Sequence, residues 1–278
     1  MPPLECLRFE DLSPYLLLRN GNYLYKVPFR DDFAVVKVYF GSRGGFANLV
    51  KSAENVLLAG QTSYMPRTRR RIERECLDVW RRHGFRVYET YDDVRVEAPG
   101  CPDDGYTVFE YRDGPKLNAY LADAQVPESE RFDTYRRFLL EWSRRHELAI
   151  AEREPRLVHE NGDGKHVLVF DDGFHWFDFE MIWRSAARVE EQVWHEIVQY
   201  VWNIHKSIPE SLRGRLLDET VTSYPDLARL RAACLSFLEH PRLGWRMARR
   251  LDRTLRARAR KPTSKYNVAQ QLLDRLAS

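Results

Sequence analysis

The stretch His159-Glu160-Asn161-Gly162-Asp163-Gly164-Lys165-His166 is the most informative part of this chain, because this polar loop runs directly into the apolar Val167-Leu168-Val169. Upstream lies Ala34-Val35-Val36-Lys37, an apolar segment that ends in a lysine. Downstream, an acidic residue stands between two aromatic ones in Phe177-Asp178-Phe179-Glu180. The order along the chain is therefore a buried strand with a lysine, a polar loop that enters a strand, and a carboxylate.

Composition and length bound the class of protein. The chain has 278 residues, of which 44% are hydrophobic and 13% aromatic, enough to fill the core of one large or two modest domains. Residues 1–12 lack the basic start and apolar stretch of a secretory signal, and no apolar run approaches the ~20 residues that span a bilayer. We therefore expect a cytoplasmic protein.

Cysteine spacing and charge narrow the expectation further. Cys6, Cys76, Cys101 and Cys234 are scattered, without a CxxC pair or histidines at zinc-ligand spacing, so we expect reduced thiols and no structural zinc. The net charge is only +3, but arginines gather at 67–71 and again at 242–261. The local field at these two places matters more than the total charge.

The first part of the chain alternates strand-like and helical patterns. A helix is predicted over 67–83, because apolar residues from Ile72 to Trp80 recur at helical spacing and Gly84 can close it. Asn20-Gly21-Asn22 predicts a tight hairpin turn. The predicted strands are 15–18, 23–29, 33–40, 86–89, 93–97 and 106–111.

From Gly114 onward the pattern is helical. One helix leads into the loop at His159 and carries a stripe made of Phe132, Tyr135, Phe138, Leu139, Trp142 and His146. A second helix, over 189–205, is predicted to bury Val193, Ile197, Val201 and Ile204. The expected fold class is therefore α+β, with a β-rich part at 1–111 that holds one inserted helix and a helical part at 112–278.

This organisation, with the three segments quoted above, resembles the bilobal protein-kinase-like fold, and the two parts would be its N-lobe and C-lobe. For phosphoryl transfer, the protein has to hold the triphosphate, offset its negative charge with cations and align the acceptor hydroxyl with it. Lys37 would reach the phosphates, and Glu73 on the inserted helix would orient it, with Glu75 as the alternative. Glu110 and Tyr111, at the end of strand 106–111, complete the predicted ATP-binding set.

Each of these assignments has a plainer alternative. Lys37 could be a lysine at a strand edge in water, and Glu73 could belong to a solvated ladder of charges beside the neighbouring arginines. Asp178 is assigned to Mg²⁺ that bridges the phosphates, but an aspartate that ends the hairpin at Asp171-Asp172-Gly173 would look the same. His166, assigned as a second metal ligand, could instead hold the loop by hydrogen bonds.

The loop departs from the kinase pattern H-x-D-x-x-x-x-N, in which the aspartate accepts the hydroxyl proton. Asn161 occupies the place of that aspartate, and His166 occupies the place of the asparagine. An asparagine has no carboxylate and cannot serve as a base. Asp163 is the proposed surrogate, because the flexible Gly162 and Gly164 would let it turn into the cleft, and Glu160 is a weaker candidate. Asn161 could also only orient an acceptor.

With these residues in view, the chain resembles the lipopolysaccharide core kinases, the bacterial heptose and Kdo sugar kinases. That family carries histidine where His166 stands, and it has a Gly-containing insertion like the one from Phe40 to Pro66. The resemblance covers about 15–204 and implies ATP, Mg²⁺ and a sugar hydroxyl acceptor on a lipid-linked oligosaccharide. The family's catalytic aspartate is replaced here by Asn161, and no glycine-rich phosphate loop is present in the sequence.

Three functions stay open at this point. The first is an ATP-dependent kinase of an envelope glycolipid, the second a pseudokinase without chemistry, and the third a kinase of small molecules. The predicted helix at 243–255 places Met247, Leu251 and Leu255 on one face among arginines, which fits peripheral contact with the cytoplasmic membrane or, alternatively, packing on the domain. No nucleic-acid partner is expected, because no base-reading module is recognisable.

Overall fold

The computed structural model describes residues 5–19, 21–39, 45–239 and 257–277, together with Met247, Leu251 and Thr254. The chain divides into two compact units. The first consists of Met1–Asp113 and His175–Arg184, and the second of Gly114–Phe174 and Ser185–Ser278. The predicted parts 1–111 and 112–278 are single stretches, whereas the first unit also takes the short segment from His175.

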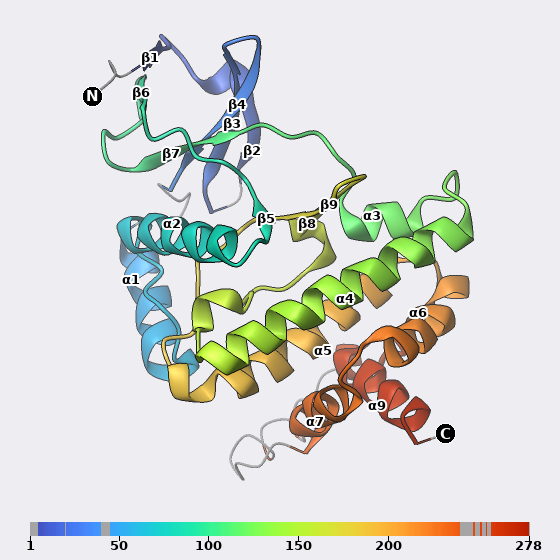
Figure 1. Cartoon of the computed structure of the whole chain (residues 1–278). Helices are drawn as coiled ribbons and strands as arrows, with labels where there is room; N and C mark the ends of the chain where they lie inside the picture. Colours follow the sequence, from blue (N-terminus) through green and yellow to red (C-terminus); the bar gives the residue numbers. More distant parts are fainter. Residues whose placement is uncertain are drawn as a thin grey trace. The chain divides into compact units, whose positions relative to one another are not determined.

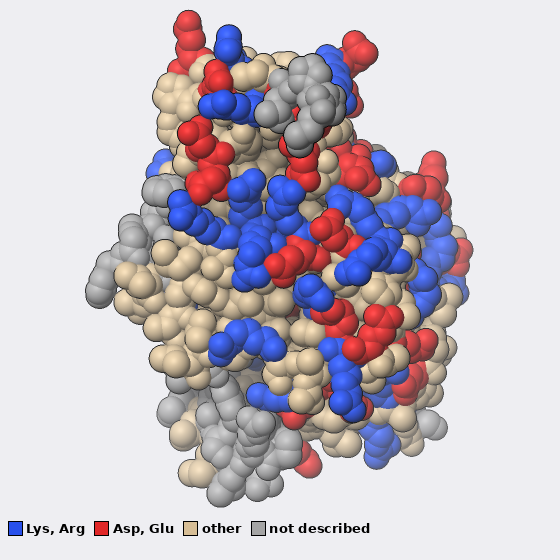
Figure 2. Space-filling view, turned by 60° about the vertical axis from the view of Figure 1, so that its left-hand side comes forward, with Lys and Arg blue, Asp and Glu red and all other residues tan. Residues whose placement is uncertain are grey.

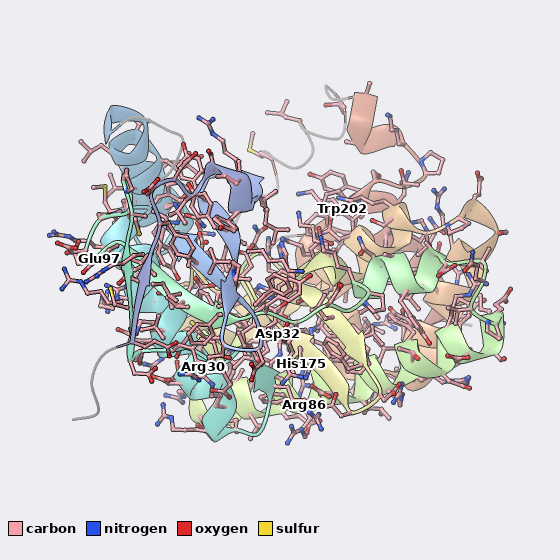
Figure 3. The ribbon with its side chains drawn as sticks, turned by 90° about the horizontal axis from the view of Figure 1, so that it is seen from above. Arg30, Asp32, Arg86, Glu97, His175 and Trp202 are labelled. Atoms are coloured by element: carbon pink, nitrogen blue, oxygen red, sulfur yellow. The ribbon has the colours of Figure 1, made fainter. Side chains whose placement is uncertain are left out.

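A four-stranded antiparallel sheet forms the core of the first unit (Figure 1). Its inward face buries alternate residues, as the period of a strand requires; on β4 these are Ala34, Val36 and Val38. Arg30, in the left-handed region at φ 53°, turns the chain from β3 into β4, and Figure 3 labels it beside Asp32. The strands, in sheet order, are β2 (Leu16–Arg19), β3 (Tyr23–Phe29), β4 (Asp32–Val38) and β7 (Tyr106–Glu110).

Two of the predicted strands pair outside this sheet. β6 (Val94–Glu97) pairs in parallel with β1 (Glu5–Arg8), a strand that the sequence pattern did not predict. The pair is held at its edge by Arg8 Nε, which donates to Glu97 (2.9 Å). β5 (Arg86–Val87) pairs in parallel with the end of β9 (Gly173–Trp176), and Figure 3 shows the partners Arg86 and His175 together. The expectation of about five strands like those of a kinase N-lobe is thus corrected to a four-stranded sheet and a separate β1–β6 pair, with β5 as an edge strand of a three-stranded sheet in the order β5-β9-β8, where β8 is Val167–Phe170.

The helix predicted at 67–83 is confirmed as α2 (Pro66–Arg82). Pro66 suits its first turn, and Gly84, at φ 75°, follows its end. The predicted apolar face is buried, and Trp80 packs against Trp176 and Phe179. The expectation of one inserted helix is wrong, because α1 (Gly45–Ala53) and the π-helix η2 (Glu54–Ala59) precede α2. The first residues of the predicted insertion, 40–44, lie outside the described residues, as does Asn20 of the predicted turn.

The second unit is built around α5 (Val189–Ser207), which contacts the short α3 (Leu117–Ala122) and four longer helices of the unit (Figure 1). The longer helices are α4 (Glu128–Glu152), α6 (Glu210–Ser223), α7 (Leu227–Leu238) and α9 (Lys265–Arg275). Both predicted apolar stripes are confirmed as buried, and the ring of Phe138 stacks on Trp142 at 5.5 Å. The second unit also contains β8 and the short helices η3 (Pro155–Leu157), η4 (Gly164–His166), η5 (Ala186–Arg188) and η6 (Ala257–Arg260). The short helix η1 (Ser13–Tyr15) belongs to the first unit.

The fold is therefore mixed α and β, with a strand-rich first unit and a helical second unit. Trp202 Nε1 on α5 donates to the Thr263 carbonyl just before α9, and Figure 3 labels this tryptophan. Most of the basic amphipathic helix predicted at 243–255 lies outside the described residues. Over the part of the chain that the structure describes, no helix is long and apolar enough to cross a membrane.

Candidate functional site

Lys37 lies at the centre of a buried cluster of charges in the first unit. It stands near the end of β4, opposite Leu24 on β3 and Thr107 on β7, and only 7% of its surface is exposed. Its Nζ lies 2.8 Å from Glu73 Oε2, 2.6 Å from Glu180 Oε1 and 3.9 Å from Asp178 Oδ1. Lys37 is thus not a solvated lysine at a strand edge.

The inserted helix α2 supplies Glu73 to this cluster. Both carboxylate oxygens of Glu73 accept from Lys37 Nζ, and the hydroxyl of Tyr39 donates to Oε2 (2.5 Å). Tyr39 is two residues after Lys37, and their Cβ atoms therefore point to one face of the extended chain. The alternative residue Glu75 is turned away by the helical period and pairs with Arg71 (2.6 Å).

Glu180 joins Lys37 to two further side chains that the sequence analysis did not assign. Arg69 Nε donates to Glu180 Oε2 (2.8 Å), and the side-chain amide of Asn22 donates to Glu180 Oε1. The guanidinium of Arg69 also donates to Asn22 Oδ1. One signal could have found Arg69, because it precedes Glu73 by one helical turn and shares its face.

Burial and charge act against each other in the cluster. Burial lowers the pKa of Lys37, but the carboxylates of Glu180 and Glu73 outweigh it, so the pKa lies well above its ordinary value. Burial likewise lowers the pKa of Arg69, and Glu180 reverses the direction. Burial raises the pKa of Glu73, although Lys37 opposes the shift. Both cations therefore keep their charge at all ordinary pH values.

Asp178 lies close to Lys37 and has an unusual backbone conformation. It lies just beyond β9 at φ 75°, in the left-handed region, which non-glycine residues adopt at some cost and aspartate more readily than most. Its side chain is 34% exposed, in contrast to the buried side chains of Glu73 and Glu180. The most accessible carboxylate of the cluster is thus the one predicted to meet a metal ion.

The other predicted nucleotide residues lie outside the buried cluster. In the register of β4 and β7, Glu110 is opposite Ala34. Glu110 accepts from the backbone of Glu89 (3.0 Å) and from Arg112 Nε (2.9 Å). The ring of Tyr111 lies under Lys26 Nζ, 3.8 Å from its centroid.

The loop with Asn161, Asp163 and His166 belongs to the second unit. Asn161 is exposed, and its Oδ1 accepts from Gln199 Nε2 at 3.5 Å. Asp163 Oδ1 accepts from the backbone of Lys165 (3.1 Å), and its other oxygen lies 3.6 Å from Lys165 Nζ. His166 is buried, and its Nδ1 lies 3.1 Å from the Asn161 carbonyl.

Helix α5 fixes this loop in place. Glu196 accepts from the backbone of His159 (2.9 Å), and Tyr200 Oη lies 2.7 Å from His159 Nδ1. Asn203 Nδ2 donates to the Gly162 carbonyl (2.9 Å). A Cβ on Gly162 would lie 2.4 Å from the ring of Tyr200, so this glycine is needed for close packing. The expectation that Gly162 lends the loop flexibility is corrected accordingly.

Glu196 is itself part of a buried charged group in the second unit. It accepts from Trp142 Nε1 (3.0 Å) and from the guanidinium of Arg145, and the side chains of Arg145 and Glu196 are fully buried. Burial raises the pKa of Glu196, but Arg145 and His146 outweigh it and bring the pKa down to about 2. Burial lowers the pKa of His146 to about 4.

The pKa of His146 predicts how stability depends on pH. The unfolded chain takes up a proton near pH 6.5 and the folded chain only near 4, so between these values the unfolded state binds more protons and stability falls as the pH falls. The contribution of His146 is about 3 kcal/mol over that window. Melting temperatures from pH 7 to 4.5 check it: His146→Gln is expected to flatten the decline, whereas the exposed His195→Gln is expected to follow the wild type.

Asp178 and His166 were predicted to bind metal. Among the residues that the structure describes, no three His, Cys, Asp or Glu side chains come together as a metal site. Mg²⁺ at phosphate-binding sites needs only one or two carboxylates, with water and phosphate oxygens as the other ligands. The accessible oxygens of Asp178 fit that requirement.

The arginines predicted to cluster at 67–71 have separate roles. Arg69 is buried, whereas Arg67 pairs with Asp104 at 3.0 Å and Arg71 with Glu75. One helical turn further on, Arg74 pairs with Asp92 (2.6 Å). Figure 2 shows basic and acidic side chains intermingled over part of one face of the molecule. Much of the positive charge of this segment is therefore balanced locally.

Comparison with known proteins adds little to this geometry. No protein-family model and no curated protein matches the chain. A solved structure described as that of an apo pseudokinase aligns over 100% of this chain and 99% of its own, with 14% sequence identity and a TM-score of 0.42. The assignment of function therefore rests on the residues of the cluster itself.

Proposed function

We propose that the protein binds Mg·ATP at the Lys37 cluster and acts as a phosphotransferase of the protein-kinase-like type. The observation that carries this proposal is the contact of Lys37 with Glu73 at 2.8 Å, with Asp178 3.9 Å away. A lysine fixed by a helical glutamate, beside an accessible aspartate, is the arrangement that holds a triphosphate and its metal ion.

Each residue of the site has a stated task in this proposal. Glu73 orients Lys37, whose ammonium offsets charge on the phosphates. Asp178 would hold Mg²⁺, which when bound neutralises charge on the transferred group. In the second unit, Asn161 would orient the acceptor hydroxyl, Asp163 is the surrogate base, and His166 is the second metal ligand or holds the loop. Glu110 and Tyr111 stay proposed contacts of the nucleotide.

The acceptor is proposed from the family resemblance alone. A sugar hydroxyl of a lipopolysaccharide or a related envelope glycolipid is the class that the resemblance to the core kinases implies. A cytoplasmic protein that meets the inner surface of the membrane would reach such a substrate. Soluble amino sugars or alcohols, the substrates of a small-molecule kinase, are the competing acceptor class.

A second candidate function, a nucleotide-binding pseudokinase, is favoured by the loop in the second unit. Asn161 lacks a carboxylate, and both oxygens of Asp163 already face Lys165, through its backbone amide at 3.1 Å and its ammonium at 3.6 Å. Lys165 therefore competes with a substrate hydroxyl for the oxygens of Asp163. This candidate keeps nucleotide binding and loses only the transfer step.

The test of the proposal measures binding and transfer separately. Mg·ATP at 100 times its Kd is expected to stabilise the wild type by about 2.7 kcal/mol. Asp178→Asn is expected to weaken Mg·ATP at least tenfold without weakening metal-free ATP, because the lost metal contact matters only when Mg²⁺ is present. Asp171→Asn, an exposed aspartate on the turn before β9, is the matched control.

Transfer is then followed with labelled ATP and a bacterial envelope extract or a panel of soluble sugars. Labelled glycolipid supports the sugar kinase, and binding without any labelled product supports the pseudokinase. Labelled soluble alcohols, with no labelled glycolipid, support the small-molecule kinase. If the wild type shows no stabilisation by ATP with or without Mg²⁺, the proposal is wrong.

A further inference from the structure

Glu180 occupies a set of hydrogen-bond donors that is suited to an oxyanion. Its carboxylate accepts from the ammonium of Lys37, the guanidinium of Arg69 and the side-chain amide of Asn22. Glu180 is 8% exposed, and Lys37, Arg69 and Asn22 are each buried as well. Ammonium, guanidinium and amide groups are also the donors that bind phosphate oxygens in proteins.

Each of the three donors has a second partner that does not involve Glu180. Lys37 is held by Glu73, and Arg69 Nη2 donates to Asn22 Oδ1. The ring of Tyr64 lies under the Arg69 guanidinium at 4.5 Å. Glu180 itself lies on a segment that is neither helix nor strand, beyond β9. The donors would therefore stay in place if the carboxylate moved away.

The charges in the cluster also favour an exchange of anions. With Glu180 present, two cations (Lys37 and Arg69) face three carboxylates (Glu73, Asp178 and Glu180), which gives a net charge of 2 − 3 = −1. Without Glu180 the balance is zero, and two desolvated cations would share the remaining carboxylates. A phosphate oxyanion would restore the lost pairing.

We propose that Lys37, Arg69 and Asn22 form an oxyanion site for a phosphate group of the nucleotide, and that Glu180 fills this site when the nucleotide is absent. The inference rests on the proposed function and assigns two phosphate-binding residues, Arg69 and Asn22, that the sequence did not reveal. Asn22 lies directly before β3. It would bind phosphate in place of the glycine-rich loop that the sequence lacks. Glu180 is a built-in competitor that lowers the apparent affinity for the nucleotide.

The experiment measures the Kd of ATP, with and without Mg²⁺, by calorimetry on the full chain. E180Q removes the competing charge at nearly constant shape, so metal-free ATP is expected to bind about tenfold more tightly than to the wild type. Glu180→Asp keeps the charge, but its shorter side chain cannot reach both cations, and it is also expected to bind ATP more tightly. If Glu180 only repelled the phosphates by its charge, Glu180→Asp would bind ATP with the affinity of the wild type.

A double variant isolates the role of Arg69. Arg69→Met in the E180Q background removes a donor without stranding a buried carboxylate, and it is expected to bind ATP about tenfold more weakly than E180Q alone. Arg74→Met with Asp92→Asn removes a matched pair on the exposed side of α2 and is expected to bind ATP like the wild type. Melting curves select the variants that are folded at the temperature of the assay.

The outcomes separate this inference from the proposed function. If the wild type binds ATP and either E180Q or Glu180→Asp fails to bind it more tightly, the proposed function stands but Glu180 does not occupy the phosphate site, which overturns the inference. The same holds if Arg69→Met in the E180Q background binds as well as E180Q. If no variant and no wild-type sample binds ATP, the proposed function and the inference both fail.

Discussion

Lys37→Met is expected to abolish detectable binding of ATP and to lower the free energy of unfolding by about 3–5 kcal/mol at pH 7.5. Binding is lost because the variant has no ammonium to meet the phosphates. Stability is lost because Glu73 and Glu180, both buried, are left without the cation that lies within 2.8 Å of each. Urea unfolding and calorimetry with Mg·ATP measure the two effects.

The direction in which the stability of Lys37→Met changes with pH identifies the cause of its lost stability. Without Lys37, burial raises the pKa of Glu73 further, so the folded variant binds more protons than the unfolded chain above pH 4.5. Acidification from pH 7.5 to 5.5 is therefore expected to narrow the difference in stability between Lys37→Met and the wild type, in which the His146 effect is the same. Lys51→Met, which removes an exposed lysine paired with Glu54, is the control and is expected to change stability by less than about 1 kcal/mol. Equal losses in the two variants would contradict the buried cluster.

The second large effect is expected at Glu196→Gln, which should lower the free energy of unfolding by about 3–5 kcal/mol. The change leaves the guanidinium of Arg145 fully buried without its carboxylate. It also weakens the acceptor for the backbone of His159, at the start of the loop that carries Asn161. Urea denaturation at pH 7 measures the loss, and hydrogen exchange at the His159 amide is expected to accelerate.

The same helix offers a matched control. Glu191→Gln breaks the exposed pair of Arg188 and Glu191 (2.7 Å) near the start of α5, and its cost is expected to stay below about 1 kcal/mol. Arg145→Met in the Glu196→Gln background removes the stranded cation and is expected to recover part of the lost stability. A double variant as unstable as Glu196→Gln alone would show that the buried charge is not the cause.

Much of the fold could be predicted because apolar residues recur along its strands and helices at the regular spacing of each element. The alternation on β4 and the apolar stripes on α2, α4 and α5 each bury one face, which a single sequence shows directly. β1 could not be assigned in this way, because so short a strand is defined by its pairing with β6. Helix α1, within the predicted insertion, is likewise a feature that the pattern did not reveal.

The candidate site was predictable only in part, for a similar reason. Lys37 and Asp178 stand in short motifs, and Glu73 follows from the apolar spacing on α2. Arg69 and Asn22 are separated from Glu180 by 111 and 158 positions, and no local pattern links them. A buried carboxylate between two cations is a product of tertiary packing, which the order of residues does not display.

Because the segment His175–Arg184 belongs to the first unit, a single cut in the chain cannot separate the two units for expression. A fragment cut after Asp113 would keep Lys37 and Arg69 but would discard both Asp178 and Glu180, and it would leave Trp80 without the rings of Trp176 and Phe179. Because Asn22 and Glu180 are 158 positions apart, any continuous piece that contains the whole cluster is longer than half of the 278-residue chain. Autonomous expression of the strand-rich half would therefore require a tethered copy of the ten-residue returning segment.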